Sequence, residues 1–124
     1  MPPDEATLEQ AAVFFKALAD SNRLRIFNTL MQGDTCNCEL IEQLGLAANL
    51  LSHHLRILRQ AGLITSRRDA VDGRWIYYTA DREAVLRWQN WCNTFFNPQR
   101  IQARDSLCGP EGLLRPVDPT QLVI

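Results

Sequence analysis

The chain has 124 residues, a length typical of one domain and sufficient to bury a hydrophobic core without disulfides. Hydrophobic residues make up 46% and charged residues 22%, the composition of a folded soluble protein. The longest run without a formal charge, residues 43–55, falls well short of the roughly 20 residues of a membrane span. The first ten residues are acidic and lack the pattern of a signal peptide, so we expect no membrane association and a cytoplasmic location.

The net charge is −1, but the charges are unevenly distributed along the chain. Residues 52–68 contain no acid and hold four arginines, namely Arg56, Arg59, Arg67 and Arg68. Of the 13 basic residues only Lys16 is a lysine. Because the planar fork of arginine suits phosphates and guanine edges, this distribution is compatible with nucleic-acid binding. On charge alone, an asymmetric solvated surface explains it equally well.

Helical spacing dominates the first half of the chain. A first helix is predicted over residues 5–18, with Leu8, Ala12, Phe15 and Leu18 on its apolar stripe. Asp20 and Ser21 are good N-caps for a second helix that ends at Gly33. We expect the inner face of that helix to carry Leu24, Phe27, Leu30 and Met31.

Two further helices follow with a tight connection between them. A short helix is predicted over residues 38–44, with Gly45 as a left-handed C-terminal cap. A longer helix over residues 47–61 buries one stripe made by Leu51, Leu55 and Leu58. Its opposite face is polar and carries Asn49, Ser52, His53, Arg56 and Gln60.

The pattern then changes to that of strands. Residues 63–68 and 74–79 are predicted to pair as a hairpin, with Asp72-Gly73 as the turn signal. Asp81 caps a last helix that runs to Phe96, with Val85, Trp88, Cys92 and Phe95 on one stripe. We therefore expect a domain over residues 1–97 that binds DNA and dimerises. The proline-containing remainder, residues 98–124, is expected to form a partly flexible tail.

Helix, turn, helix and hairpin in this order predict a mainly α fold with a β-hairpin wing, the winged helix-turn-helix. The polar groups of the longer helix are of the types that bond base edges, so Asn49, Ser52, His53 and Arg56 are candidate DNA contacts. The hairpin adds Arg67, Arg68 and Arg74 as candidate contacts to phosphates or the minor groove. The alternatives are an ordinary solvated helix face and a winged-helix module that binds protein. An enzyme is not expected, because Cys36 and His53 have no accompanying acid or oxyanion loop.

Three segments of the chain resemble the ArsR/SmtB family of metalloregulatory repressors. They are Ala17–Ile26 (ALADSNRLRI), Ser52–Ile64 (SHHLRILRQAGLI) and Asp72–Tyr78 (DGRWIYY), and the likeness covers about residues 8–97. The resemblance implies a dimeric winged-helix repressor that leaves a palindromic, double-stranded operator when an inducer binds. By position, Ser52 and His53 fall where the family contacts bases. One departure is the opening Ala47-Ala48-Asn49, where many members have a polar run.

One side chain of the longer helix and an aromatic surface of the last helix have structural interpretations. His54 lies on the core side of its helix, and we interpret it as a hydrogen-bonding structural residue. The last helix carries an aromatic surface too large for a solvated helix, made by Trp88, Trp91, Phe95 and Phe96. We therefore expect a homodimer held mainly by the first and last helices, whose two-fold symmetry would match a palindrome.

The segment Cys36-Asn37-Cys38-Glu39-Leu40 resembles the Cys-x-Cys-Asp-Leu segment of the family's arsenite and cadmium/lead sensors. Two thiols at a helix start favour thiolate forms, and thiolates select soft ions. We therefore predict Cys36 and Cys38 as ligands of arsenite or antimonite, with cadmium, lead or zinc as alternatives. A thiol-based sensor of oxidants or reactive sulfur is a further alternative, and inert thiols are the simplest one.

The third sulfur ligand departs from the family pattern. Ile41 stands where arsenite sensors have their third cysteine, and no cysteine precedes Cys36. The remaining thiols are Cys92, on an apolar helix stripe, and Cys108, in the polar tail. A cysteine on an apolar stripe is more often core than ligand, so Cys108 is the preferred third ligand and Cys92 the alternative. The ligand could come from the same chain or from a partner.

Overall fold

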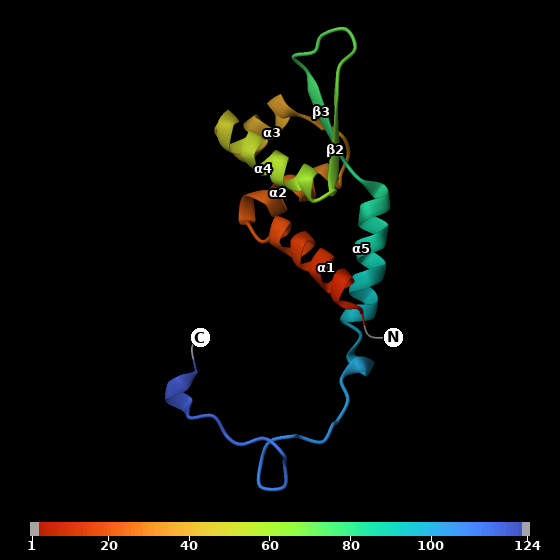
Figure 1. Cartoon of the computed structure of the whole chain (residues 1–124). Helices are drawn as coiled ribbons and strands as arrows, with labels where there is room; N and C mark the ends of the chain where they lie inside the picture. The colour runs from red at the N-terminus through yellow and green to blue at the C-terminus, as the bar shows by residue number, and fades with distance from the viewer. Residues whose placement is uncertain (1–2, 123–124) are drawn as a thin grey trace.

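The computed structural model describes residues 3–122 and consists of a helical body, a protruding hairpin and a trailing tail (Figure 1). Helices α1 (Glu5–Leu18) and α2 (Ser21–Leu30) come first, followed by α3 (Asn37–Leu44) and α4 (Ala48–Gln60). Strands β2 (Ile64–Arg68) and β3 (Ile76–Ala80) form the hairpin, and α5 (Arg82–Phe95) closes the body. The predicted mainly α fold with a hairpin wing is therefore confirmed. Four of the predicted helices lie within one residue of their expected bounds, whereas α2 ends three residues before Gly33.

Aspartates cap three of the helices. The side chains of Asp4, Asp20 and Asp81 accept hydrogen bonds from backbone N–H groups in the first turns of α1, α2 and α5. These bonds satisfy N–H groups that a helix cannot pair internally. Helix α3 is different, because the sulfur of Cys36 occupies the capping position and accepts from the N–H of Glu39 at 3.4 Å.

The buried face of α2 differs from the prediction. Leu24 and Met31, expected on the inner face, are 52% and 53% exposed, whereas Ile26 and Leu30 are buried. The helix is rotated because Arg23 lies on the same side as Ile26 and bonds to neighbouring helices. The spacing of apolar residues therefore predicted the helix and two of the four inner residues, since Leu30 is buried and Phe27 packs against the core.

A third strand was missed by the sequence analysis. Strand β1 (Thr35–Cys36) pairs antiparallel with β3, which places Cys36 opposite Tyr77 and gives the strand order β1-β3-β2. Strands β2 and β3 pair in the register Ile64 with Ala80. Two residues are too few to show an alternating pattern, so this strand left no periodic signal.

The tip of the hairpin is longer than the two-residue turn predicted from Asp72-Gly73. The strands end at Arg68 and begin again at Ile76, and a seven-residue loop, 69–75, connects them. Within it, the N–H of Trp75 donates to the carbonyl of Asp72, so the turn lies where it was predicted. Gly73 does not have the positive φ that a tight two-residue hairpin requires.

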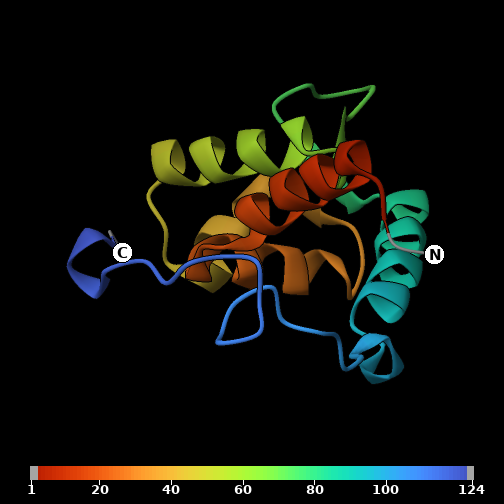
Figure 2. The same cartoon turned by 60° about the horizontal axis from the view of Figure 1, so that its bottom comes forward.

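Helices α1 and α5 converge near the start of α1 (Figures 1 and 2) and share a cluster of aromatic rings. Phe14 of α1 stacks on Trp88 of α5 at a centroid distance of 4.6 Å, and Trp91 stacks on Phe95 at 4.5 Å. Trp88 is buried, whereas Phe96 at the end of the cluster is 63% exposed. The expected apolar surface on α5 is therefore present in the single chain and remains partly open.

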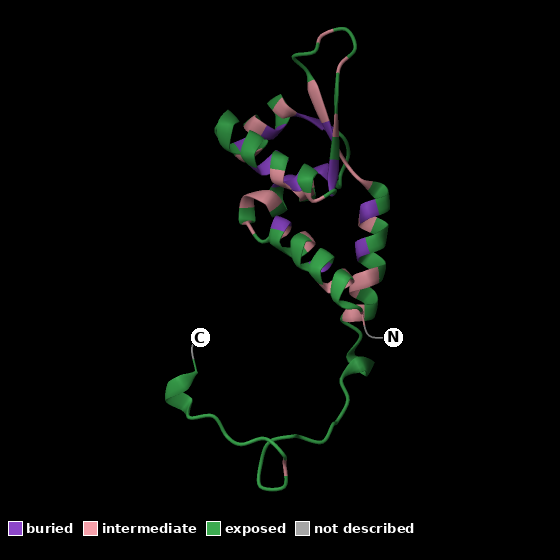
Figure 3. Ribbon diagram, viewed as in Figure 1, coloured by how far each residue is buried: buried purple, intermediate pink, exposed green. Residues whose placement is uncertain are grey.

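The core lies between the helices and the sheet, whereas the tail has no core of its own. The largest fully buried side chains are Ile26, Leu40, Leu51, Leu58 and Leu63. After a short 3-10 turn, η1 (Pro98–Arg100), almost every described residue of the tail is exposed (Figure 3). A second such turn, η2 (Pro119–Gln121), lies near the end. Over residues 3–122, every helix is too short or too polar to cross a bilayer.

Candidate nucleic-acid interface and thiol sites

The polar face of α4 is exposed, as the sequence predicted. Asn49, Ser52, His53 and Arg56 are all exposed, and Gln60 continues the same face. On the opposite side, Leu51, Leu55 and Leu58 are buried in the core. The helix therefore presents amide, hydroxyl, imidazole and guanidinium groups to solvent from a firmly packed base.

The start of α4 explains the unusual Ala47-Ala48-Asn49 opening. Ala47 occupies the N-cap position in an extended conformation, and no side chain caps the helix. Asn49 instead uses its side-chain carbonyl to accept from the N–H of Leu50 at 3.0 Å. Among the described residues, no such side-chain partner bonds the N–H groups of Ala48 and Asn49, and free N–H groups at a helix start can bond a phosphate oxygen.

The wing arginines form contacts within the hairpin. Arg68 donates to the carbonyl of Gly73 at 2.7 Å, and the guanidinium of Arg67 lies 4.5 Å from the ring centroid of Tyr77. Arg74 pairs with Asp72 at 2.7 Å, although its side chain is 89% exposed. Hydrogen bonds from the Arg74 side chain lower the pKa of Asp72 and raise the pKa of Arg74.

His54 has the structural role that the sequence predicted. It is 5% exposed, and its Nδ1 lies 3.3 Å from Nη1 of Arg23. Its Nε2 lies 4.0 Å from the carboxylate of Asp20. The pKa of Asp20 is lowered, chiefly by the hydrogen bond from the backbone N–H of Arg23, with smaller contributions from the backbone N–H of Asn22 and the charge of Arg23.

Cys36 and Cys38 lie at the start of α3, as expected, but in different surroundings. Cys36 is buried, and its sulfur lies 3.5 Å from the Glu39 carboxylate, whereas Cys38 is exposed. Cys36 also belongs to β1, so its backbone pairs with Tyr77, whose ring lies beneath the guanidinium of Arg67. This link between a candidate thiol ligand and the wing was not visible in the sequence.

The candidate third ligands lie elsewhere in the chain. Cys92 is half-buried on α5, and Cys108 is exposed in the tail. Among residues 3–122, the structure gathers no group of three or more His, Cys, Asp or Glu side chains suited to a metal ion. A three-sulfur site therefore requires either movement of the tail or a sulfur from another chain.

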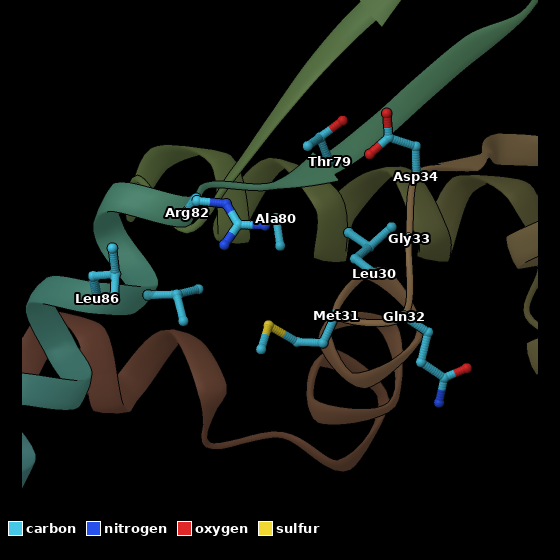
Figure 4. A pocket seen from close by; sticks show the side chains of 10 residues that line it. Leu30, Met31, Gln32, Gly33, Asp34, Thr79, Ala80, Arg82 and Leu86 are labelled. Atoms are coloured by element: carbon cyan, nitrogen blue, oxygen red, sulfur yellow. The ribbon is translucent and has the colours of Figure 1, made fainter.

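A separate pocket of about 470 Å³ opens between the end of α2, β3 and the start of α5 (Figure 4). Its lining combines apolar side chains, including Leu30 and Leu86, with the charged side chains of Asp34 and Arg82. None of the cysteines or the exposed α4 residues lines it, so it is distinct from both candidate sites.

The central part of the chain matches a known family. The profile described as "Bacterial regulatory protein, arsR family" matches residues 20–66. A transcriptional repressor described as an SmtB homolog from Synechocystis is 40% identical over 87 residues, covering 68% of this chain and 64% of that protein. The nodulation protein NolR of Rhizobium meliloti is 36% identical over 88 residues, covering 70% of each chain.

An arsenical resistance operon repressor of Bacillus subtilis is 46% identical over 72 residues, which cover 57% of this chain and 66% of that one. The chain thus spans slightly less than two thirds of this repressor and of the Synechocystis protein. These relatives are transcriptional repressors rather than enzymes, in agreement with the expectation from the sequence.

Solved structures share the fold over three quarters of the chain. HlyU from Vibrio cholerae has a TM-score of 0.62 at 29% identity, covering 75% of this chain and 98% of that one. NolR from Sinorhizobium fredii has a TM-score of 0.59 at 29% identity, covering 77% and 96% respectively. Because nearly all of each neighbour is matched, about a quarter of the present chain has no counterpart in either of them.

Proposed function

Because this chain belongs to the ArsR/SmtB family of transcriptional regulators, we propose that it is a homodimeric repressor that releases a palindromic operator when a soft ion binds its thiols. The observation that carries the DNA-binding part is the exposed polar face of α4 above a buried leucine stripe. Asn49, Ser52, His53 and Arg56 lie in the major groove, and the wing adds Arg67, Arg68 and Arg74.

The wing and the helix have different tasks in this proposal. Arg74 is exposed and contacts phosphates, which fixes the position of the protein but carries no sequence information. His53 lies on the exposed face of α4 and reads a base edge. Substitutions at the two positions should therefore have different signatures.

The test begins with selection of duplexes from random-sequence DNA by the wild-type protein. We expect a palindromic consensus. His53→Ala should change the preference at one position of each half-site, at a cost of about 1–3 kcal/mol. Arg74→Ala should weaken binding to all duplexes alike, and it should reduce the slope of log affinity against log salt concentration by about one. Failure of the wild-type protein to enrich any duplex would refute the DNA-binding proposal and favour a protein-binding winged-helix module.

The proposed inducer is trivalent arsenic or antimony, bound by Cys36, Cys38 and Cys108. The similarity to an arsenical resistance repressor supports this choice, as do two cysteines one residue apart at the start of α3. The exposed tail supports Cys108 over the half-buried Cys92 as third ligand, because the tail can move without deforming the core. Such an ion would draw the buried Cys36 sulfur away from the N–H of Glu39.

Loss of that cap couples the thiols to both DNA-binding elements. Cys36 begins α3, the helix that precedes α4, and its backbone pairs with Tyr77 in β3. A ligand at Cys36 therefore acts on the helix-turn-helix and on the wing together. To release the operator, the ion must bind the DNA-free form more tightly than the DNA-bound form, typically by about 1–3 kcal/mol.

Release of the selected operator by arsenite, measured by fluorescence anisotropy, tests the inducer. Cys36→Ser and Cys38→Ser should abolish release, and Cys108→Ser should weaken it strongly, whereas Cys92→Ser should respond normally. A normal response of Cys36→Ser and Cys38→Ser to arsenite would place the site elsewhere. If Cys92→Ser no longer released the operator while Cys108→Ser still did, the third ligand would be Cys92. Release of the operator by cadmium or a polysulfide but not by arsenite would support the proposed repressor function and refute arsenite as its inducer.

A further inference from the structure

The packing of α4 depends on a single directed contact. Among the residues that the structure describes, His54 is the only side chain of α4 that hydrogen-bonds to another helix. The other buried positions of α4 are Leu51, Leu55 and Leu58. Burial of this stripe fixes the rotation of α4 only coarsely, because contacts between apolar side chains have no preferred direction. The hydrogen bond to His54 has a preferred direction and can fix it.

The partner of His54 is itself anchored at the junction of α1 and α2. Nε of Arg23 donates to the carbonyl of Ala17 at 2.6 Å, and Nη2 donates to the carbonyl of Lys16 at 3.3 Å. These carbonyls belong to the last turn of α1, and the carbonyl of Lys16 also accepts from the backbone N–H of Ala19. Nη1 remains for His54 at 3.3 Å. One guanidinium therefore joins the end of α1, the first turn of α2 and the middle of α4.

The geometry also defines the protonation of the imidazole. A guanidinium can only donate, so Nδ1 of His54 must act as the acceptor and carry no proton. The proton of the neutral ring then lies on Nε2, which faces the Asp20 carboxylate at 4.0 Å. Asp20 caps α2 through the N–H groups of Asn22 and Arg23, so its position is fixed by the same helix.

We propose that Asp20 and Arg23 are positioning residues for operator recognition, acting through His54 to set the rotation of α4. His54 directly follows Ser52 and His53 and precedes Arg56 by two residues. A rotation of α4 about its axis would therefore move these three candidate base contacts, and Asn49 on the same helix, relative to the groove. The inference rests on the proposed operator binding for its effect on affinity, but the arrangement of α4 can be measured without DNA.

The first test is the tautomer of His54 in the DNA-free wild-type protein, read from imidazole ¹⁵N chemical shifts at a pH where the ring is neutral. We expect a single tautomer protonated at Nε2. Arg23→Gln should change the His54 spectrum to a mixture of tautomers. A wild-type ring that is protonated at Nδ1, or that is already a mixture, would overturn the proposal.

The second test compares His54→Gln with His54→Leu on the selected operator and on a scrambled duplex. A glutamine amide can both accept from Arg23 and donate to Asp20, whereas leucine can do neither. We expect His54→Leu to lose about tenfold or more in operator affinity and to bind the scrambled duplex as before. His54→Gln should restore most of the operator affinity. Equal operator binding by both variants would contradict the proposal.

Arg23→Gln should lower operator affinity in the same way as His54→Leu. Its control is Arg82→Gln, which removes the same charge from the surface of α5 and should leave operator affinity unchanged. Should His54→Leu fail to fold, Arg23→Gln decides the outcome, because it leaves the buried ring in place. Equal effects of Arg23→Gln and Arg82→Gln would then refute the positioning role.

The DNA-free protein separates this inference from the proposed function. Residual dipolar couplings of backbone amides report the orientation of α4 relative to α1 and α2. We expect that orientation to change in His54→Leu and Arg23→Gln and to be kept in His54→Gln. If the wild-type protein selected no duplex but the variants showed this pattern, the proposed DNA binding would be refuted and the positioning of α4 by Asp20, Arg23 and His54 would stand. If the orientation of α4 were unchanged in all variants, only this positioning role would be refuted.

Discussion

Asp72 and Arg74 form an ion pair at the tip of the wing, where a DNA-binding protein needs free positive charge. Arg74 donates to the Asp72 carboxylate from Nε and Nη2, and the backbone N–H of Arg74 donates to the same carboxylate. The carboxylate therefore shapes the loop, and in the proposed complex with DNA it would compete with phosphate for one guanidinium. Exposed ion pairs contribute little to stability, so we expect the pair to influence DNA affinity more than folding.

Asp72→Asn should raise the affinity for every duplex severalfold without changing base preference. The asparagine oxygen can still accept from the backbone N–H of Arg74, while the guanidinium becomes free to contact phosphate. Binding measured over a range of salt concentrations checks this, with Asp105→Asn in the tail as a control of equal charge. If Asp105→Asn raised the DNA affinity by the same factor, the effect would come from net charge and not from the wing.

Asp20 should give the protein a defined response to acid. Its pKa is lowered in the folded protein, first by the hydrogen bond from the backbone N–H of Arg23. A carboxylate with a lowered pKa stabilises the fold above its ordinary, unfolded value of about 4, and this stability is lost as the pH falls through the folded value.

Thermal unfolding between about pH 7 and pH 3 measures this response. The melting temperature of the wild type should fall more steeply in acid than that of Asp20→Asn, whose amide also caps helices but does not titrate. Asp118→Asn is the control, because the pKa of Asp118 is also lowered but the residue lies in the tail. Parallel pH profiles for the wild type and Asp20→Asn would contradict the prediction.

At the scale of elements, the turn between α3 and α4 depends on one residue. Gly45 ends α3 with φ +66° and ψ +26°, and its N–H donates to the carbonyl of Ile41 at 2.9 Å. A Cβ built there would meet no heavy atom within 4 Å. The requirement for glycine is therefore conformational and not a matter of space.

Gly45→Ala should destabilise the protein by roughly 1 kcal/mol, because the left-handed conformation is costly for residues with a Cβ. Gly73→Ala is a matched control, since Gly73 has equally free space but no positive φ. Urea unfolding of both variants measures the difference. Equal stability of the two variants would show that the turn adapts to alanine.

Much of the element order was readable from the sequence, and the exceptions have physical causes. Caps such as Asp20 and Gly45 are local signals, so the helices were predicted closely. The inward position of His54 followed from helical spacing, but its bonds to Arg23, 31 residues away, required the fold. The link from Cys36 to Tyr77 was hidden for the same reason, since pairing over such a separation leaves no pattern in either segment. Cys36 and Cys38 lie together at the start of α3, but among the described residues no third sulfur completes a site there. The tail that carries Cys108 is exposed and has no packing that would bring it to α3.

At the scale of the whole molecule, the aromatic cluster predicts self-association. Phe96→Ser should shift the sedimentation of the protein at micromolar concentration towards the monomer, because Phe96 extends the exposed end of the cluster shared by α1 and α5. Leu113→Ser removes a more exposed apolar side chain from the tail and should leave sedimentation unchanged. A wild-type protein that sediments as a monomer would refute the dimer.

The tail should be separable from the body. A chain shortened after Arg100 should keep the melting temperature and operator affinity of the full chain, because residues 101–122 are nearly all exposed. It should lose most of its response to arsenite, because it lacks Cys108. A shortened chain that still releases DNA normally would remove Cys108 from the ligand set, and one that melts early would show that the tail belongs to the domain.

The three tryptophans are divided between the wing and the aromatic cluster, and this makes the protein its own optical probe. Trp88 is buried against Phe14, and its indole N–H finds no acceptor among the described residues. Trp75 lies in the wing loop and is 44% exposed. Ultraviolet emission from the first should be blue and that from the second red, since water lowers the energy of the excited indole. The two ends of one emission spectrum thus report separately on the aromatic cluster of α1 and α5 and on the wing, without any added dye.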